Sequence, residues 1–204
     1  MQRAAECLRD RLQRHLAAHQ RVTVEDGELR HAAVSVVVVE DAMGDASFVL
    51  TRRATGMRAH RGQWALPGGR VDDGEGVEGA ALRELAEEVA LHGVEILGLL
   101  DDYPTRSGYR ITPVVVWGGT DPALQPNPAE VAAIYRIPLT ELERPDSPRF
   151  VSMPETDRPV IQVPVGDRLI HAPTAAVLFQ FREVGLHGRG TRVAHFDQPP
   201  FAWQ

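Results

Sequence analysis

The chain has 204 residues, enough to bury a substantial apolar core without disulfides, and its 43% hydrophobic and 25% charged content excludes general disorder. The formal net charge is −6 and all 22 basic residues are arginine, which excludes lysine Schiff-base chemistry and the P-loop. The acidic balance also argues against nucleic acid as a partner, and a single cysteine, Cys7, excludes an intramolecular disulfide and a thiolate zinc cluster.

Residues 4–18 are predicted to form an amphipathic helix, because apolar residues recur there at three- and four-residue spacings. The arginines between them interrupt the apolar core that a signal peptide needs, and no later apolar run has the length of a membrane span. We therefore expect a cytoplasmic protein without a membrane partner. His15 and His19 have the i, i+4 spacing of a metal pair, but with no third ligand near them we interpret both as solvated surface residues.

The rest of the chain alternates strands and helices. The β-branched run 32–39 is typical of a strand covered on both faces, and the turn 41–45 leads to a second strand, 48–51. The later elements are a helix at 77–91, strands at 94–100, 109–117 and 131–137, a proline-rich loop at 121–128, a hairpin of 160–165 with 168–171, a helix at 174–186 and an irregular tail at 188–204. Because no linker divides these elements, we expect one domain, 1–204, of α/β or α+β class.

The central helix carries a cluster of acidic residues. Glu84, Glu87 and Glu88 lie at i, i+3 and i+4, so their carboxylates share one narrow wedge and repel one another. Oxygen ligands in such a cluster are what a hard divalent cation requires. The apolar residues expected to hold the helix on a sheet are Leu82, Leu85 and Val89. Arg83 follows Glu75 by eight residues, and an ion pair between them would tie the preceding loop to the helix.

These residues belong to a longer pattern: Gly69, five residues, Glu75, seven residues, then Arg-Glu-Leu-x-Glu-Glu-x-Ala-Leu over 83–91. The pattern resembles the Nudix box of the Nudix hydrolases, with Ala90 in place of the usual glycine. Since alanine takes the left-handed conformation less readily, we expect the helix end to move toward Gly93. The resemblance implies a mixed β-sheet sandwiched between helices, with residues 69–91 forming a loop, a helix and a loop over the sheet.

The resemblance also implies a metal-dependent reaction. In that family the glutamates, here Glu84, Glu87 and Glu88, bind Mg²⁺ or Mn²⁺ with help from a backbone carbonyl just before the box, here that of Gly68. The reaction is hydrolysis of a nucleoside diphosphate linked to another group. The general base varies among relatives, and the candidates are Glu88 and Glu130; the plainer interpretation of Glu130 is a solvated glutamate after a proline-rich loop.

A second resemblance lies upstream of the box. The run Leu-Thr-Arg-Arg ending at Arg53, the segment 57–63 and Pro-Gly-Gly at 67–69 are similar to the motif of coenzyme A diphosphatases, with alanine, methionine and leucine replacing its serine, leucine and phenylalanine. Arg52, Arg53, Arg58 and His60 would then bind the phosphates of a small-molecule nucleotide substrate, since arginine can hold phosphate in a bidentate fork. The alternative is an exposed arginine-rich loop in a chain without lysine.

Other functions stay open at this point. ADP-ribose, another nucleotide-sugar or dinucleotide diphosphate, or a nucleoside triphosphate could replace coenzyme A, and a non-catalytic nucleotide sensor is a different class. The segment 74–79 fits the dinucleotide-binding pattern G-x-G-x-x-G, but no strand directly precedes it, which excludes a Rossmann oxidoreductase. The two resemblances cover about 48–142, and the flanking segments could shape a pantetheine site or a homodimer contact.

Overall fold

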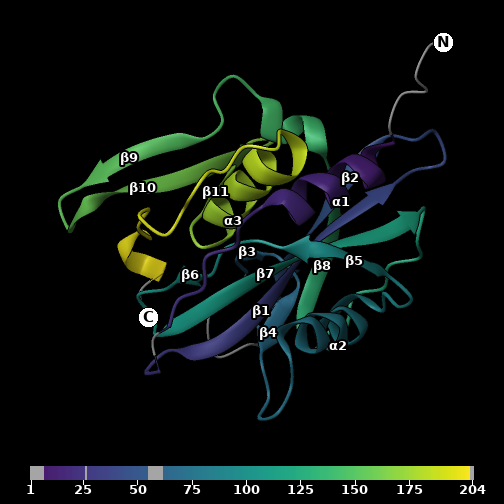
Figure 1. Cartoon of the computed structure of the whole chain (residues 1–204), viewed down its shortest axis with the longest axis horizontal. Helices are drawn as coiled ribbons and strands as arrows, with labels where there is room; N and C mark the ends of the chain where they lie inside the picture. Colours follow the sequence, from purple (N-terminus) through teal and green to yellow (C-terminus); the bar gives the residue numbers. More distant parts are fainter. Residues whose placement is uncertain (1–6, 26, 55–61, 203–204) are drawn as a thin grey trace.

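A large mixed sheet crosses the middle of the molecule (Figure 1). The computed structural model describes residues 7–25, 27–54 and 62–202. Within these residues the sheet has eight strands: β1 (Arg30–Glu40), β2 (Ala46–Arg53), β3 (Trp64–Ala65), β4 (Gly68–Arg70), β5 (Glu95–Leu99), β6 (Tyr103–Pro104), β7 (Tyr109–Thr120) and β8 (Val131–Pro138). The strands β3-β2-β1-β7-β5 form its main path, while β4 pairs with β1, β6 with β7 and β8 with β2.

Strand β1 lies at the centre of this sheet, as its valine-rich sequence predicts. It runs parallel to β7 and antiparallel to β2 and β4. Side chains alternate between the two faces of a strand, and here both faces are buried. Val36 and Val38 belong to the apolar core on one face, and Val37 and Val39 belong to the core on the other. The second strand predicted after the turn 41–45 is confirmed as β2, which forms a hairpin with β1.

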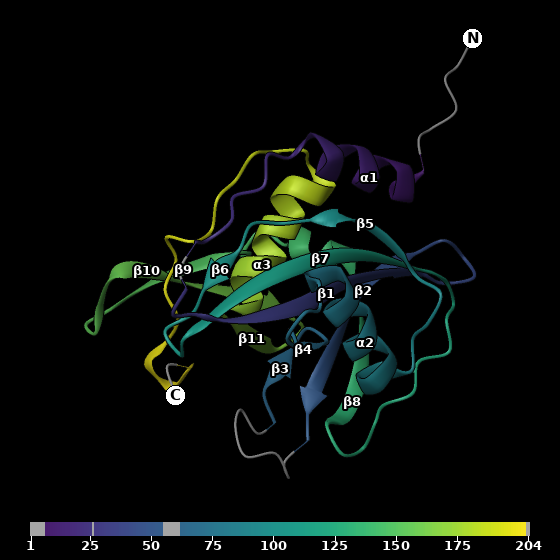
Figure 2. The ribbon, with the colours of Figure 1, turned by 60° about the horizontal axis from the view of Figure 1, so that its bottom comes forward.

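Helices cover both faces of the sheet (Figure 2). On one face lie α1 (Leu8–Ala18) and α3 (Thr174–Gln180), which continues as the π-helix η2 (Phe181–Leu186). A second sheet of β9 (Arg149–Met153), β10 (Thr156–Val165) and β11 (Arg168–His171) packs against α3. The helix α2 (Val77–Val89) covers the opposite face. The predicted fold class, a mixed sheet between helices, is confirmed, and none of the helices in the described ranges has the length and apolar composition of a membrane-spanning segment.

Two expectations for α2 were wrong. The helix ends at Val89 and does not extend toward Gly93, because Ala90 itself takes the left-handed conformation at φ 55° and ψ 30°. The amide of Leu91 then bonds to the carbonyl of Leu85 at 3.2 Å, which closes the helix end. Leu82 does not hold the helix on the sheet, since it is 36% exposed. Two small residues pack there with Leu85 and Val89: Ala80 and Ala81.

The interpretation of His15 and His19 as solvated residues was also wrong. The His19 side chain is only 3% exposed, and its Nε2 lies 3.0 Å from Oδ1 of the buried Asp101. His15 Nδ1 lies 2.8 Å from the carbonyl oxygen of Gly185. Both histidines therefore connect α1 to the body of the protein.

Four short or exposed strands were not predicted: β3, β4, β6 and β9. The first three have only two or three residues, too few to show an alternating pattern. Strand β9 is mostly exposed, and it pairs with residues 160–162 of the predicted strand and with Thr156 ahead of it. The predicted hairpin of β10 with β11 is confirmed, and the tail beyond η2 is irregular apart from the short 3₁₀ helix η3 (Pro200–Ala202).

Candidate active site

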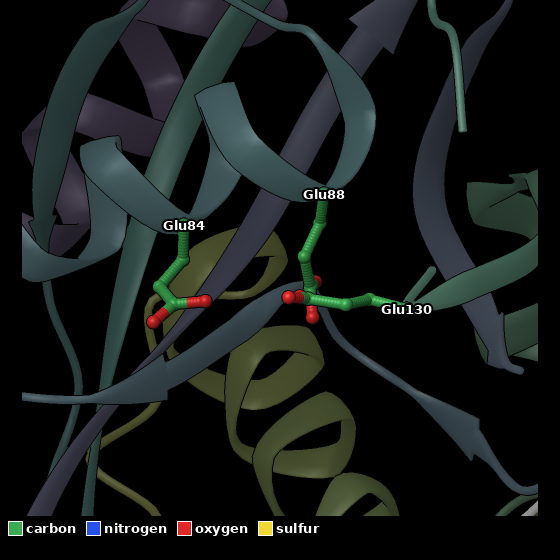
Figure 3. Close-up of side chains that lie close together, drawn as sticks. All are labelled: Glu84, Glu88 and Glu130. Carbon is green, nitrogen blue, oxygen red and sulfur yellow. The ribbon is translucent and has the colours of Figure 1, made fainter. Parts of the chain in front are cut away.

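Three carboxylates from two parts of the chain meet beside α2. Glu84 and Glu88 lie one turn apart on the helix, and Glu130 comes from the loop before β8. One oxygen from each lies within 4.8 Å of the others, and all three side chains point toward the same space (Figure 3). Among the described residues, this is the one group of acidic, histidine or cysteine side chains close enough to share a metal ion.

Backbone hydrogen bonds bring Glu130 to the helix. The last carbonyls of a helix lack partners within it. Here the loop supplies them: the amide of Gln125 bonds to the carbonyl of Val89 and that of Asn127 to the carbonyl of Glu88, both at 3.0 Å. The carbonyl of Glu130 in turn accepts a bond of 2.8 Å from the amide of Ala54, just after β2. The loop is thus fixed on both sides of the cluster.

Burial makes Glu84 and Glu88 costly to ionise. Glu88 is only 3% exposed, and burial raises the pKa of its carboxyl group to about 7 against the opposing effects of the Gly68 amide and the Arg53 charge. Burial also raises the pKa of Glu84, against the opposing effect of Arg83. Three adjacent carboxylates with two raised pKa values call for a positive charge between them. Hard oxygen donors in this number fit Mg²⁺ or Mn²⁺.

Two glycines let strand β4 approach the cluster closely. A Cβ atom at Gly69 would lie 2.2 Å from Oε1 of Glu84, so the carboxylate occupies the space that a side chain would fill. A Cβ atom at Gly68 would lie 2.3 Å from the carbonyl oxygen of Ala33, and the Gly68 amide donates a bond of 3.1 Å to Oε2 of Glu88. Neither position has room for another residue. The backbone of Gly68 therefore lies at the cluster, where the resemblance places a metal-binding carbonyl.

Arg83 connects the helix to the loop that precedes it. The ion pair expected with Glu75 forms, with Nη2 of Arg83 3.1 Å from Oε2 of Glu75, and it lowers the pKa of the Glu75 carboxyl group. Arg83 also bonds to Oε1 of Glu84 at 2.8 Å and to Oε2 of Glu87 at 3.3 Å. The Glu87 side chain is 52% exposed and lies outside the group of three carboxylates. Arg83 thus positions Glu84, while Glu87 remains on the solvent side.

The two described arginines that were predicted to bind phosphate, Arg52 and Arg53, line different cavities. Arg53 lines the cavity described below, and its buried Nε atom has no hydrogen-bond partner among the described residues. Arg52 is exposed and lines a different cavity, beside Tyr135 and the turn of β10 and β11. Arg58 and His60 lie outside the described residues. Of the predicted substrate contacts in the described chain, Arg53 is therefore the one beside the carboxylates.

A cavity of about 320 Å³ borders the cluster through Arg53, Gly68 and Gly69. One wall is the face of the large sheet, with Ala32 and Val34 of β1 and Ile111 and Tyr109 of β7. The facing wall comes from β11, the start of α3 and the tail, and its main residues are His171, Pro173, Thr174, Gln198 and Phe201. Sequence reasoning missed this second wall, whose only signal was the apolar residues of the tail. The flanking segments were expected to shape either a substrate site or a homodimer contact. The C-terminal segment lines a cavity.

Comparisons with known proteins show the family and the fold. A family model described as NUDIX domain matches residues 29–155. An uncharacterized Nudix hydrolase, NudL, of Cronobacter sakazakii is 41% identical over 118 residues, which cover 56% of this chain and 60% of that protein. The Citrobacter koseri protein of the same name is 37% identical over 149 residues, 71% of this chain and 76% of that protein. The crystal structure of a MutT/nudix family protein from Enterococcus faecalis shares the fold at 20% identity and a TM-score of 0.53, covering 90% of this chain and 75% of that one.

Proposed function

The chain belongs to the Nudix family, and on that premise we propose that it hydrolyses the diphosphate bond of a nucleoside diphosphate derivative with the help of Mg²⁺ or Mn²⁺. The observation that carries the proposal is the meeting of Glu84, Glu88 and Glu130 beside a cavity. The preferred substrate is coenzyme A or a thioester of it, and the products are 3′,5′-ADP and 4′-phosphopantetheine or its acyl derivative. The chain spans about 60% of the length of the Cronobacter relative, so the activity is proposed from this chain's own site.

The three clustered carboxylates and the carbonyl of Gly68 would hold the metal ion, with Glu87 as a further ligand. A bound divalent ion neutralises negative charge on a diphosphate and lowers the pKa of an attacking water. Arg83 keeps Glu84 in place through its bond of 2.8 Å. The proton of the attacking water would go to Glu88 or Glu130, the two candidate general bases, whose carboxylates lie at the cluster.

The neighbourhood of the cavity supports an anionic substrate. Arg53 lines the cavity, and its positive charge also acts on Glu88, so it is suited to a diphosphate bound beside the carboxylates. The volume of about 320 Å³ is at the lower end of the range for small-molecule sites. The mixed apolar and polar walls suit a nucleoside or a pantetheine arm. We also propose a cytoplasmic location, in keeping with the free cysteine, Cys7.

A substrate panel tests this function. The purified chain is incubated with Mg²⁺ and coenzyme A, acetyl-coenzyme A, ADP-ribose, NADH or a nucleoside triphosphate, and the products are separated by chromatography. We expect 3′,5′-ADP from both coenzyme A compounds, its loss in EDTA, and its return with excess Mg²⁺ or Mn²⁺. Release of AMP from ADP-ribose or NADH instead would be consistent with the metal chemistry but would overturn the assignment of coenzyme A as the substrate. If none of the substrates is hydrolysed, the result would favour a nucleotide sensor.

A further inference from the structure

Two arginines flank one tyrosine ring at the edge of the cavity. The guanidinium carbon of Arg30 lies 4.1 Å from the centre of the Tyr109 ring, and that of Arg70 lies 5.8 Å from the same centre. Nε of Arg70 also donates a bond of 3.0 Å to the Tyr109 hydroxyl oxygen. Tyr109 itself lines the cavity. We name these three residues the arginine–tyrosine clamp.

The sheet register places the clamp on the cavity side. Arg70 and Ile111 pair with Ala32 from its two neighbouring strands, and Arg30 pairs with Tyr109. Paired residues of adjacent strands point to the same face, and so do residues two apart along a strand. Since Ala32, Ile111 and Tyr109 all line the cavity, the side chains of both arginines rise from the same face of the sheet.

Both arginines are exposed, and neither has a carboxylate partner among the described residues. In the part of the chain that the structure describes, Arg30 and Arg70 make no ion pair; Arg30 donates one side-chain bond, of 3.2 Å, to the carbonyl of Ser107. A guanidinium group has five N–H donors, so both arginines can donate to an additional acceptor. Stacking on the Tyr109 ring holds them in place, which reduces the entropy lost when they bind an anion.

The clamp lies close to the carboxylate cluster along strand β4. Arg70 follows Gly68 by two residues on β4, a separation of about 7 Å along an extended strand. Building on the proposed function, in which the diphosphate lies beside Gly68, a further phosphate on the adjacent ribose falls within reach of Arg70. We propose that the arginine–tyrosine clamp binds the 3′-phosphate of the substrate and makes the protein select 3′-phosphorylated nucleoside diphosphate derivatives.

Two substrates that differ only in this phosphate test the proposal. Coenzyme A and dephospho-coenzyme A share the diphosphate and the pantetheine arm, and dephospho-coenzyme A lacks the 3′-phosphate. We expect the wild-type protein with Mg²⁺ to have a kcat/KM about tenfold or more higher for coenzyme A, as loss of a charged hydrogen bond entails. In Arg30→Ala and Arg70→Ala this ratio should fall toward one. The matched control is Arg11→Ala, which removes an exposed arginine of α1 and should keep the wild-type ratio.

Inhibition by products provides a second measurement. In the wild-type protein 3′,5′-ADP should inhibit more strongly than AMP, and Arg70→Gln, which is less disruptive to β4 than alanine, should remove the difference. Equal kcat/KM for both substrates in the wild type, or an unchanged ratio in folded variants of both arginines, would overturn the clamp and leave the diphosphatase intact. If the protein hydrolyses ADP-ribose but neither coenzyme A nor dephospho-coenzyme A, both the coenzyme A assignment and the clamp would be overturned.

Discussion

Replacing Glu88 by glutamine is expected to stabilise the metal-free protein at neutral and alkaline pH. An unfolded glutamate loses its proton near pH 4.5, whereas burial keeps the folded Glu88 protonated up to about pH 7. Between these values the folded state binds more protons than the unfolded state, so the free energy of unfolding falls as the pH rises. Glutamine does not titrate, and its amide oxygen can still accept the bond from the Gly68 amide.

The size of the effect follows from the shift. A rise from 4.5 to about 7 at about 1.4 kcal/mol per pKa unit corresponds to at most about 3.5 kcal/mol. The free energy of unfolding of Glu88→Gln relative to wild type should therefore increase from about pH 4.5 to about pH 7 and then level off. Above the upper value the variant is the more stable protein.

Urea unfolding in EDTA at about pH 5 and about pH 8 measures this difference. Comparison with the wild type at each pH cancels the other titrating groups, and Glu78→Gln, which removes an exposed carboxylate from the same helix, is the matched control. Added Mg²⁺ should then stabilise the wild type more than Glu88→Gln, since a ligand that binds only the folded state raises its stability. A difference between Glu88→Gln and wild type that does not change with pH, or that shrinks as the pH rises, would refute the reasoning.

The remaining predictions concern the other parts of the site. Glu130→Gln should lower kcat by at least about 100-fold with normal folding. Glu87→Gln should have a smaller effect, a decrease of at least about tenfold, because the Glu87 carboxylate is only a further ligand. A wild-type kcat in either variant would remove that residue from the metal site. Gly69→Ala should weaken Mg²⁺ binding measured by calorimetry, since its Cβ would displace the Glu84 carboxylate, whereas Gly79→Ala, whose nearest contact is 3.4 Å, should bind Mg²⁺ normally. Ala90→Gly should raise the stability in urea by about 1 kcal/mol, because glycine takes the left-handed conformation without strain; an unchanged or lower stability would contradict this.

The sequence predicts best what depends on spacing along one element. Glu84 and Glu88 share a helix face because they are four residues apart, and β1 is recognisable because almost all of its apolar run, 32–39, is buried. The Arg83 bond to Glu75 likewise spans one loop and one helix turn. Such features need no knowledge of how distant segments pair.

How distant segments meet was beyond the sequence, although the family resemblance had already named Glu130 as a candidate base. Glu130 joins the cluster through backbone bonds to the end of α2, and no side-chain pattern encodes those bonds. The place of Glu87 on the solvent side depends on how α2 rotates against the sheet. Tyr109 meets Arg30 and Arg70 only through the register of three strands. In each case the contact is set by tertiary packing, which local propensity does not determine.

The cavity has walls of separate origin in the chain, and this has a consequence for engineering and for evolution. The sheet wall falls within residues 29–155, which match the family, while the wall of β11, α3 and the tail lies after them. The carboxylates all belong to the first part. Substitutions of the cavity-lining residues at 169–202 would therefore alter this wall and leave the three carboxylates in place, because none of the carboxylates belongs to that segment.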